Sequence, residues 1–259
     1  MKLAILLFGH MRTFEYSSRF FMKNLAEKYD SDIFIHTWDT IDSYTKSWND
    51  NFHALGKIDY HRKKIIKDIY HPKKLEIGHQ NNKNDVIVES SDGKKRLSLN
   101  GMNYMFRSLK SANNLMHDYS TRNSISYDYV LATRPDVAIY NYLDIQETIT
   151  EAESLNIDID NARFFAGLYG DSETNVRLLC NRVTDILFFA RPSVIDRYIE
   201  ANSIFTKDEI DKSFKNVVSI YTRNEIKAGI QPIEICFACE KDWKNVPWEN
   251  VPESVRSAL

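Results

Sequence analysis

The pattern of apolar and polar positions at the start of the chain predicts a strand, a helix and a second strand. Residues 3–8 form an uninterrupted apolar run, which is typical of a strand covered on both faces. Apolar residues then recur at helical spacing from Thr13, a candidate N-cap, to about Tyr29. A second short strand is predicted at 32–39. This order forms a βαβ unit, so we expect an α/β sheet with neighbouring parallel strands.

The rest of the chain continues the alternation of helices and strands. The clearest helix is predicted to begin at an Asn100 cap and to end before Thr121, and a strand follows at 127–132. Further strands are predicted at 75–77, 163–166, 185–190 and 233–237, a loop or small hairpin at 78–96, and helices at 193–202 and 207–228. Because neither a repeat nor a linker interrupts the sequence, we expect a single domain spanning 1–259, with a mostly parallel, Rossmann-like sheet flanked by helices.

Composition and charge narrow the classes of function. The chain has 259 residues, of which 43% are hydrophobic, and this is enough for a sizeable core. A net charge of −2 lacks the basic excess of a nucleic-acid-binding protein, so no nucleic-acid partner is expected. No apolar run approaches the roughly 18 residues that cross a bilayer, and no small-residue cleavage site follows the short run at 3–8. We therefore expect a cytoplasmic protein.

The three cysteines agree with a reducing compartment, because an odd number in a long chain does not indicate a disulfide framework. Cys236 and Cys239 have the spacing of a metal knuckle or a redox pair. Their neighbours are apolar and no second pair has ligand spacing, which favours cysteines of the core.

The first cluster of candidate functional residues is Gly9-His10-Met11-Arg12, directly after the first strand. In open α/β sheets, ligands bind beyond the carboxyl ends of strands, and the N-terminus of the following helix attracts anions. Gly9 allows close approach of the backbone, and Arg12 is a bidentate donor suited to phosphate. The sequence matches neither a P-loop nor a dinucleotide fingerprint. The alternative is an ordinary turn with a surface arginine.

Two further clusters follow the second strand and the strand at 127–132. Trp38 offers a ring face for stacking and Asp39 an acceptor for ribose or a base; alternatively, Asp39 caps a helix and Trp38 lies in the core. Arg134 and Asp136 flank a proline, and Asp136 is placed to hold a divalent cation against a diphosphate, while Arg134 could neutralise the same phosphates without a metal. The alternative is a structural Arg–Asp turn.

Three other features have both a functional and a structural interpretation. Asp185 opens an apolar strand, where a carboxylate is either a turn acceptor or a general base. Glu225 is expected on a late helix, where a solvated position is the simpler interpretation. The basic stretch Lys57–Lys74 is either a solvated helix face or a surface that contacts anionic lipid or a lipid-diphosphate acceptor.

These segments together resemble a known family. The first strand ending in Gly-His-Met-Arg-Thr-Phe, followed by Asp-Ile-Phe-Ile-His-Thr-Trp-Asp, is similar to bacterial and viral glycosyltransferases of surface-polysaccharide synthesis, which build capsule and lipopolysaccharide. The segment 127–136 resembles the one in which GT-A-type enzymes carry their Asp-x-Asp motif. The segment 184–193 is similar to their acceptor-side strand and helix, and 225–230 to their late glutamate-containing helix.

The resemblance implies a GT-A-like fold, a nucleotide-sugar donor, a saccharide or lipid-linked acceptor, and often a divalent cation, Mn²⁺ or Mg²⁺. It assigns donor binding to six residues and catalytic roles to two others: Gly9, His10, Arg12, Trp38, Asp39 and Arg134 would hold the donor, Asp136 would face the metal or diphosphate, and Asp185 would be the base. Arg134 stands where the first aspartate of Asp-x-Asp would be. A site with one carboxylate fewer is expected to bind a metal more weakly, and Arg134 could take over part of the charge neutralisation.

Two alternatives to a glycosyltransferase follow from the same residues. One is a transferase of phosphoryl or modified-phosphate groups onto the same polysaccharides, which the mass of the product distinguishes. The other is a catalytically silent nucleotide-sugar-binding protein on this fold, which the replacement of an aspartate by Arg134 favours. Tight donor binding without hydrolysis or transfer distinguishes this last class.

Overall fold

The computed structural model describes most of the N-terminal two thirds of the chain and short segments beyond it. The described residues are 1–42, 56–80, 86–89, 96–139, 142–154, 158–166, 187–202, 230–231 and 235–237. The helices are α1 (Phe14–Asn24), η1 (Ala26–Lys28, a 3₁₀ turn), α2 (Tyr60–Tyr70), α3 (Leu99–Asn123), α4 (Ile145–Ser154) and α5 (Pro192–Ala201). The strands are β1 (Lys2–Gly9), β2 (Asp30–Trp38), β3 (Lys74–Gly78), β4 (Ile87–Glu89), β5 (Arg96–Ser98), β6 (Tyr129–Thr133), β7 (Val137–Ile139), β8 (Arg163–Ala166), β9 (Leu187–Ala190), β10 (Ile230–Gln231) and β11 (Ile235–Phe237).

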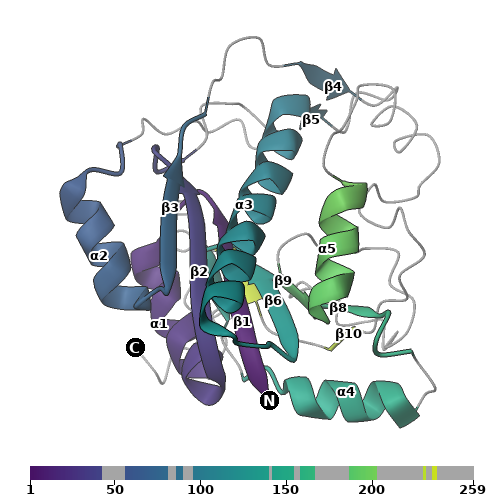
Figure 1. Ribbon diagram of the computed structural model, residues 1–259. Coiled ribbons are helices and arrows are strands. Elements are labelled where there is room, and N and C mark those ends of the chain that lie inside the picture. The colour runs from purple at the N-terminus through teal and green to yellow at the C-terminus, as the bar shows by residue number, and fades with distance from the viewer. Residues whose placement is uncertain are drawn as a thin grey trace, which may run out of the picture.

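A mixed, mostly parallel sheet organises these elements (Figure 1). Its seven strands have the order β10-β8-β9-β6-β1-β2-β3. Strand β1 pairs in parallel with β2 and β6, and β2 pairs in parallel with β3, whereas β9 runs antiparallel to both β6 and β8. Two small antiparallel pairs, β4 with β5 and β7 with β11, lie outside this sheet. The predicted α/β class and mostly parallel sheet are confirmed.

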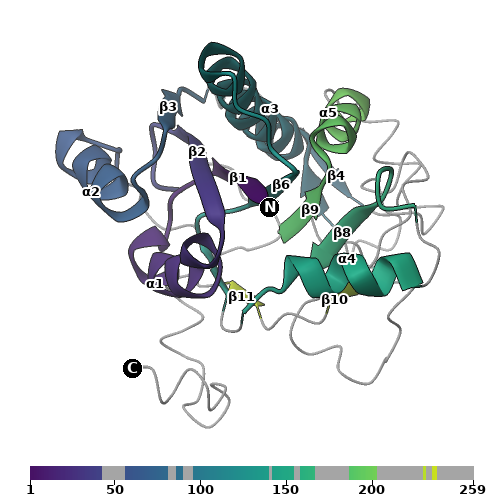
Figure 2. The ribbon, with the colours of Figure 1, turned by 60° about the horizontal axis from the view of Figure 1, so that its bottom comes forward.

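Helices cover both faces of the sheet, which explains the uninterrupted apolar run of β1. Leu3, Ile5 and Leu7 point to the face that α1, α2 and α4 cover. Their neighbours along β1, including Leu6 and Phe8, point to the face that α3 and α5 cover. Figure 2 shows α3 and α5 on one side of the sheet and α1 and α4 on the other. A strand with both faces buried needs apolar residues at every position, since successive side chains alternate between the faces.

The strand order creates a topological switch point beside β1. The chain moves outward from β1 through β2 to β3, and it returns through α3 to β6 on the other side of β1. The connections that leave β1 and enter β6 therefore run on opposite faces, because α1 and α3 cover different faces. In open α/β sheets, ligands bind where such connections diverge, beyond the carboxyl ends of the two strands. The segments at this place are the ones that follow Gly9 and Thr133.

The ends of two helices differ from the prediction. Helix α3 begins at Leu99, and its cap is Ser98, whose Oγ accepts from the backbone N–H of Gly101 at 2.7 Å. The predicted Asn100 cap is therefore wrong by two residues, because only Ser98 has the extended backbone that a cap requires. Helix α1 ends at Asn24, where a 3₁₀ turn replaces the predicted continuation.

Several predictions lie outside the described residues. They include Asp185, the helix at 207–228 with Glu225, and the cysteines at 180 and 239. Within the described helices, none combines the length and the apolar character needed to cross a membrane.

Candidate functional site

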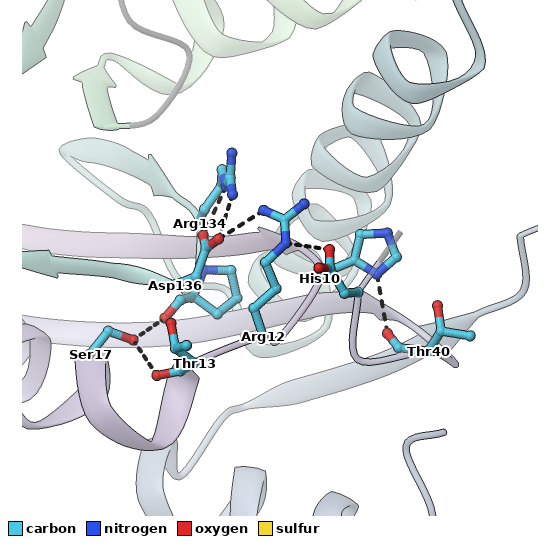
Figure 3. A network of polar contacts seen from close by, with 9 residues as sticks. His10, Arg12, Thr13, Ser17, Thr40, Arg134 and Asp136 are labelled. Carbon is cyan, nitrogen blue, oxygen red and sulfur yellow. Dashed lines mark hydrogen bonds and ion pairs between the residues drawn. The ribbon is translucent and has the colours of Figure 1, made fainter. Parts of the chain in front are cut away.

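The segments that follow β1 and β6 meet in a cluster of charges around a buried aspartate (Figure 3). Asp136 is 2% exposed. Arg12 donates from Nη1 to Asp136 Oδ2 at 2.8 Å, and Arg134 donates from Nε to Oδ1 at 2.8 Å and from Nη2 to Oδ2. Both carboxylate oxygens therefore accept from guanidinium groups. The first and third clusters predicted from the sequence form one site at the topological switch point.

The backbone of the first loop places Arg12 at this position. Gly9 has a φ of +96° and Arg12 a φ of +37°, so the loop turns sharply at two places. Met11 is fully buried between them and anchors the loop in the core. On the other loop, Ser17 of α1 donates from Oγ to the carbonyl oxygen of Pro135. This bond ties the start of α1 to the segment that carries Asp136.

Arg12 also binds a second carboxylate that the sequence analysis did not single out. Its Nε donates to Asp42 Oδ1 at 2.5 Å, and its backbone N–H donates to the carbonyl oxygen of Ile41 at 2.9 Å. The result is an alternating series of charges, in the order Arg134, Asp136, Arg12, Asp42. Asp42 is one polar residue among many in the segment 40–60, and its position beside Arg12 depends on the path of the chain after β2.

His10 is buried next to this series and remains neutral. Burial lowers its pKa from 6.5 to about 4, and the positive charge of Arg12 acts in the same direction. Its Nδ1–H donates to the carbonyl oxygen of Thr40 at 3.1 Å. Nε2 has no hydrogen-bond partner in the described part of the chain. His10 therefore joins the first loop to the segment after β2 and leaves one buried acceptor atom.

Burial also raises the pKa of Asp136, while Arg12 acts in the opposite direction. Because both oxygens accept hydrogen bonds from guanidinium groups, we treat this carboxylate as ionised.

The end of β2 divides the two residues predicted there between the core and the surface. Trp38 is buried, and its ring contacts the rings of His36 and Tyr104 edge-on. This is the core position given as its alternative, so its face is not open for stacking. Asp39 caps no helix; its Oδ2 accepts from Nδ1 of the exposed His79 at 2.7 Å. Its Oδ1 has no hydrogen-bond partner among the described residues.

A buried serine on α3 holds the first loop through a hydrogen bond to its backbone. Ser108 Oγ accepts from the backbone N–H of Gly9 at 2.8 Å, lies 2.7 Å from His36 Nδ1, and donates to the carbonyl oxygen of His36 at 3.1 Å. Burial lowers the pKa of His36 to about 4, so this histidine is neutral as well. The sequence carries a signal for Ser108, because it stands next to Leu109 in the apolar stripe of α3.

The residues at this site do not fit a divalent cation. Mn²⁺ and Mg²⁺ require several oxygen ligands, and both oxygens of Asp136 already accept from arginine side chains. Within the ranges that the structure describes, no group of three or more His, Cys, Asp or Glu side chains is arranged to hold a metal ion. Two guanidinium groups lie against Asp136 and would repel a cation bound to this carboxylate. The role of Asp136 as a metal ligand, expected by resemblance, has no support in this donor set.

Comparison with known proteins assigns no family to the chain: no family model matches it, and no curated protein matches it.

Proposed function

We propose that the protein is a glycosyltransferase of the GT-A type. It would move a sugar from a nucleotide-diphosphate-sugar donor to a saccharide or lipid-linked acceptor in surface-polysaccharide synthesis. The observation that carries the proposal is the Arg12–Asp136–Arg134 cluster, built around the buried Asp136 at the switch point of a mostly parallel sheet. The mixed sheet, with β9 antiparallel between β6 and β8, is compatible with this type of enzyme.

The charges of the cluster suit the leaving group of such a transfer. A nucleoside diphosphate leaves with negative charge on its phosphate oxygens, and fixed positive groups stabilise that charge as it develops. Arg12 and Arg134 present guanidinium groups, whose planar fork matches phosphate geometry. The N-terminus of α1 begins at Phe14, two residues after Arg12, and adds a favourable dipole.

The polar atoms at and near the end of β2 favour binding of the nucleoside there. Asp39 lies next to the first loop, because the segment that follows it binds Arg12 and His10 through backbone carbonyl groups. Its Oδ1 is buried and has no hydrogen-bond partner among the described residues, so it would be the acceptor for a ribose hydroxyl or a base N–H. The buried Nε2 of His10 is a second acceptor nearby. In this proposal Gly9 and His10 hold the nucleotide end of the donor, and Trp38 supports these residues from the core.

The acceptor side of the reaction needs a base for the attacking hydroxyl. The resemblance suggests Asp185 as this base. Asp185 lies outside the described residues, so its role stays a prediction.

The test is a transfer assay with UDP-, GDP- and CMP-sugars on saccharide and lipid-linked acceptors, read by product mass. Asp136→Asn is expected to abolish most turnover, because it removes the charge that orients both arginines. The matched control is Asp32→Asn. Asp32 is also buried and ion-paired, with Lys2 and Lys73, but it lies at the start of β2, at the opposite edge of the sheet.

Each result of this assay has a defined meaning. Loss of turnover in Asp136→Asn but not in Asp32→Asn supports the site, and wild-type turnover in Asp136→Asn contradicts it. A product that gains a phosphate rather than a sugar would establish the phosphoryl transferase. Tight donor binding without hydrolysis or transfer on any acceptor would establish a silent binding protein.

We also propose contact between the basic stretch Lys57–Lys74 and an anionic membrane surface, which would place the enzyme at the inner face of a membrane. Five cationic or titratable side chains and two other residues line a groove of about 350 Å³ at the end of α2: Lys63, Lys67, His71, Pro72, Lys73, Lys74 and Leu75. Among the described residues, no acidic side chain lines this groove. Basic residues near an anionic lipid surface each contribute about 1 kcal/mol to binding.

A further inference from the structure

The alternating charges of the site lead to an inference that rests on the proposed function. We propose that the phosphate groups of the donor bind directly to Arg12 and Arg134 without a divalent cation, and that they displace Asp42 from Arg12. Asp136 is then a positioning residue that holds the two guanidinium groups in place.

Both carboxylate oxygens of Asp136 already bind the two arginines. Asp136 is buried, and its two oxygens accept from Nη1 of Arg12 and from Nε and Nη2 of Arg134. A cation that used this carboxylate would have to break these charge-assisted hydrogen bonds and lie against two guanidinium groups. The same geometry favours an anion, because the side chains of Arg12 and Arg134 keep 26% and 15% of their surface exposed.

The two carboxylates bound to Arg12 differ in burial. The side chain of Asp136 is 3% exposed, whereas that of Asp42 is 33% exposed. Asp136 is also held by Arg134, two residues away on the same loop. Asp42 is therefore the partner that an incoming ligand can replace, and its carboxylate and a phosphate offer the same oxygen acceptors to the guanidinium.

The four charged side chains of the site also determine which ligand charge it can accept. Arg12 and Arg134 carry two positive charges, and Asp136 and Asp42 carry two negative ones, so the charges of these four side chains sum to zero. When a phosphate replaces Asp42, the positive charge of Arg12 faces the ligand. Arg134 lies nearby, because it binds the same carboxylate of Asp136 as Arg12 does. The site thus gains the charge that a metal would otherwise supply to a diphosphate.

The experiment is calorimetry of the full-length protein with inorganic pyrophosphate and with UDP and GDP, in EDTA and in Mn²⁺, together with a titration of Mn²⁺ alone. We expect at least one of these phosphate ligands to bind in EDTA. Arg134→Lys keeps a positive charge but loses the planar fork, so it should weaken binding about tenfold or more. Asp42→Asn should tighten binding severalfold, because the competing carboxylate is gone.

Arg191→Lys is the matched control. Arg191 is also half-buried and ion-paired, with Asp160 at 3.0 Å, but it lies at the opposite edge of the sheet, where it donates to the carbonyl oxygen of Asp128. This variant should leave the affinity unchanged. The gain in affinity of Asp42→Asn keeps the proposal falsifiable even if Arg134→Lys fails to fold, since a misfolded protein does not bind more tightly.

The proposal is overturned if phosphate ligands bind only with Mn²⁺, if Mn²⁺ alone binds the wild type but not Asp136→Asn, if none of the ligands binds in EDTA, or if Asp42→Asn binds no more tightly. These failures are distinct from a failure of the proposed function. Sugar transfer that requires Mn²⁺ would leave the glycosyltransferase standing and refute the metal-free site. Arginine-dependent binding in EDTA without any transfer would do the reverse.

Discussion

Two buried histidines next to the site, His10 and His36, should make the stability of the protein fall between pH 7 and pH 5. Each has a pKa of about 4 in the folded chain against 6.5 for an unperturbed histidine. Below pH 6.5 the unfolded chain therefore binds protons that the folded chain excludes. The contribution of these two histidines to the free energy of unfolding is present in full above pH 6.5 and is lost as the pH falls toward 4.

The size of the effect follows from these pKa values. At pH 5 an unfolded histidine is almost fully protonated, whereas the folded one is mostly neutral. Moving from pH 7 to pH 5 therefore costs about 2 kcal/mol for each histidine, or about 4 kcal/mol for both. A loss of this size is a large share of the stability of an ordinary domain.

The assay is urea denaturation at pH 7, 6 and 5, with His10→Asn and His36→Asn as variants. Asparagine places its amide where Nδ1 stands in each histidine, so the bonds to Thr40 and Ser108 can be kept while the titrating group is removed. The difference between wild type and variant isolates one histidine from all the carboxylates. Each variant should recover about half of the loss. A variant with the same dependence on pH as the wild type would refute the reasoning.

Three further predictions concern single contacts. Ser108→Ala leaves the N–H of Gly9 without its acceptor and should cost about 1–3 kcal/mol in urea denaturation; a change near zero would contradict its role. Gly78→Ala should cost about 1–3 kcal/mol, because the new Cβ would lie 2.8 Å from His36 Nε2 and 3.0 Å from a ring carbon of Trp38; an unchanged midpoint would show that the rings can move. Lys63→Glu with Lys67→Glu should reduce co-sedimentation with anionic vesicles, and Lys110→Glu on α3 should not; equal binding by both would argue against the basic groove.

The strands and their polar ends were predictable because they depend on local pattern. The apolar run of β1 required burial on both faces, and the turn signals after it placed Gly9 and Arg12 at a strand end. The same reasoning located Arg134 and Asp136 after β6. These predictions use side chains near in sequence, so no knowledge of distant pairing was needed.

The contacts between the clusters were not predictable in the same way. That Arg12 meets Asp136 depends on β6 pairing with β1, and such pairing joins segments more than a hundred residues apart. Asp42 reaches Arg12 only because the chain after β2 returns over the first loop. Trp38 was left open between core and stacking surface, since the end of a strand does not reveal whether a helix residue such as Tyr104 covers it.

The most direct test of the account is an NMR titration of the arginine Nε–Hε resonances with UDP and GDP. The central claim is that a nucleoside diphosphate binds between the carboxyl ends of β1 and β6, on Arg12 and Arg134. We expect these two resonances to shift with saturation, the Arg12 signal most strongly because its Nε leaves Asp42. The resonance of Arg191 should stay in place. Saturable binding that moves neither Arg12 nor Arg134 would contradict the account.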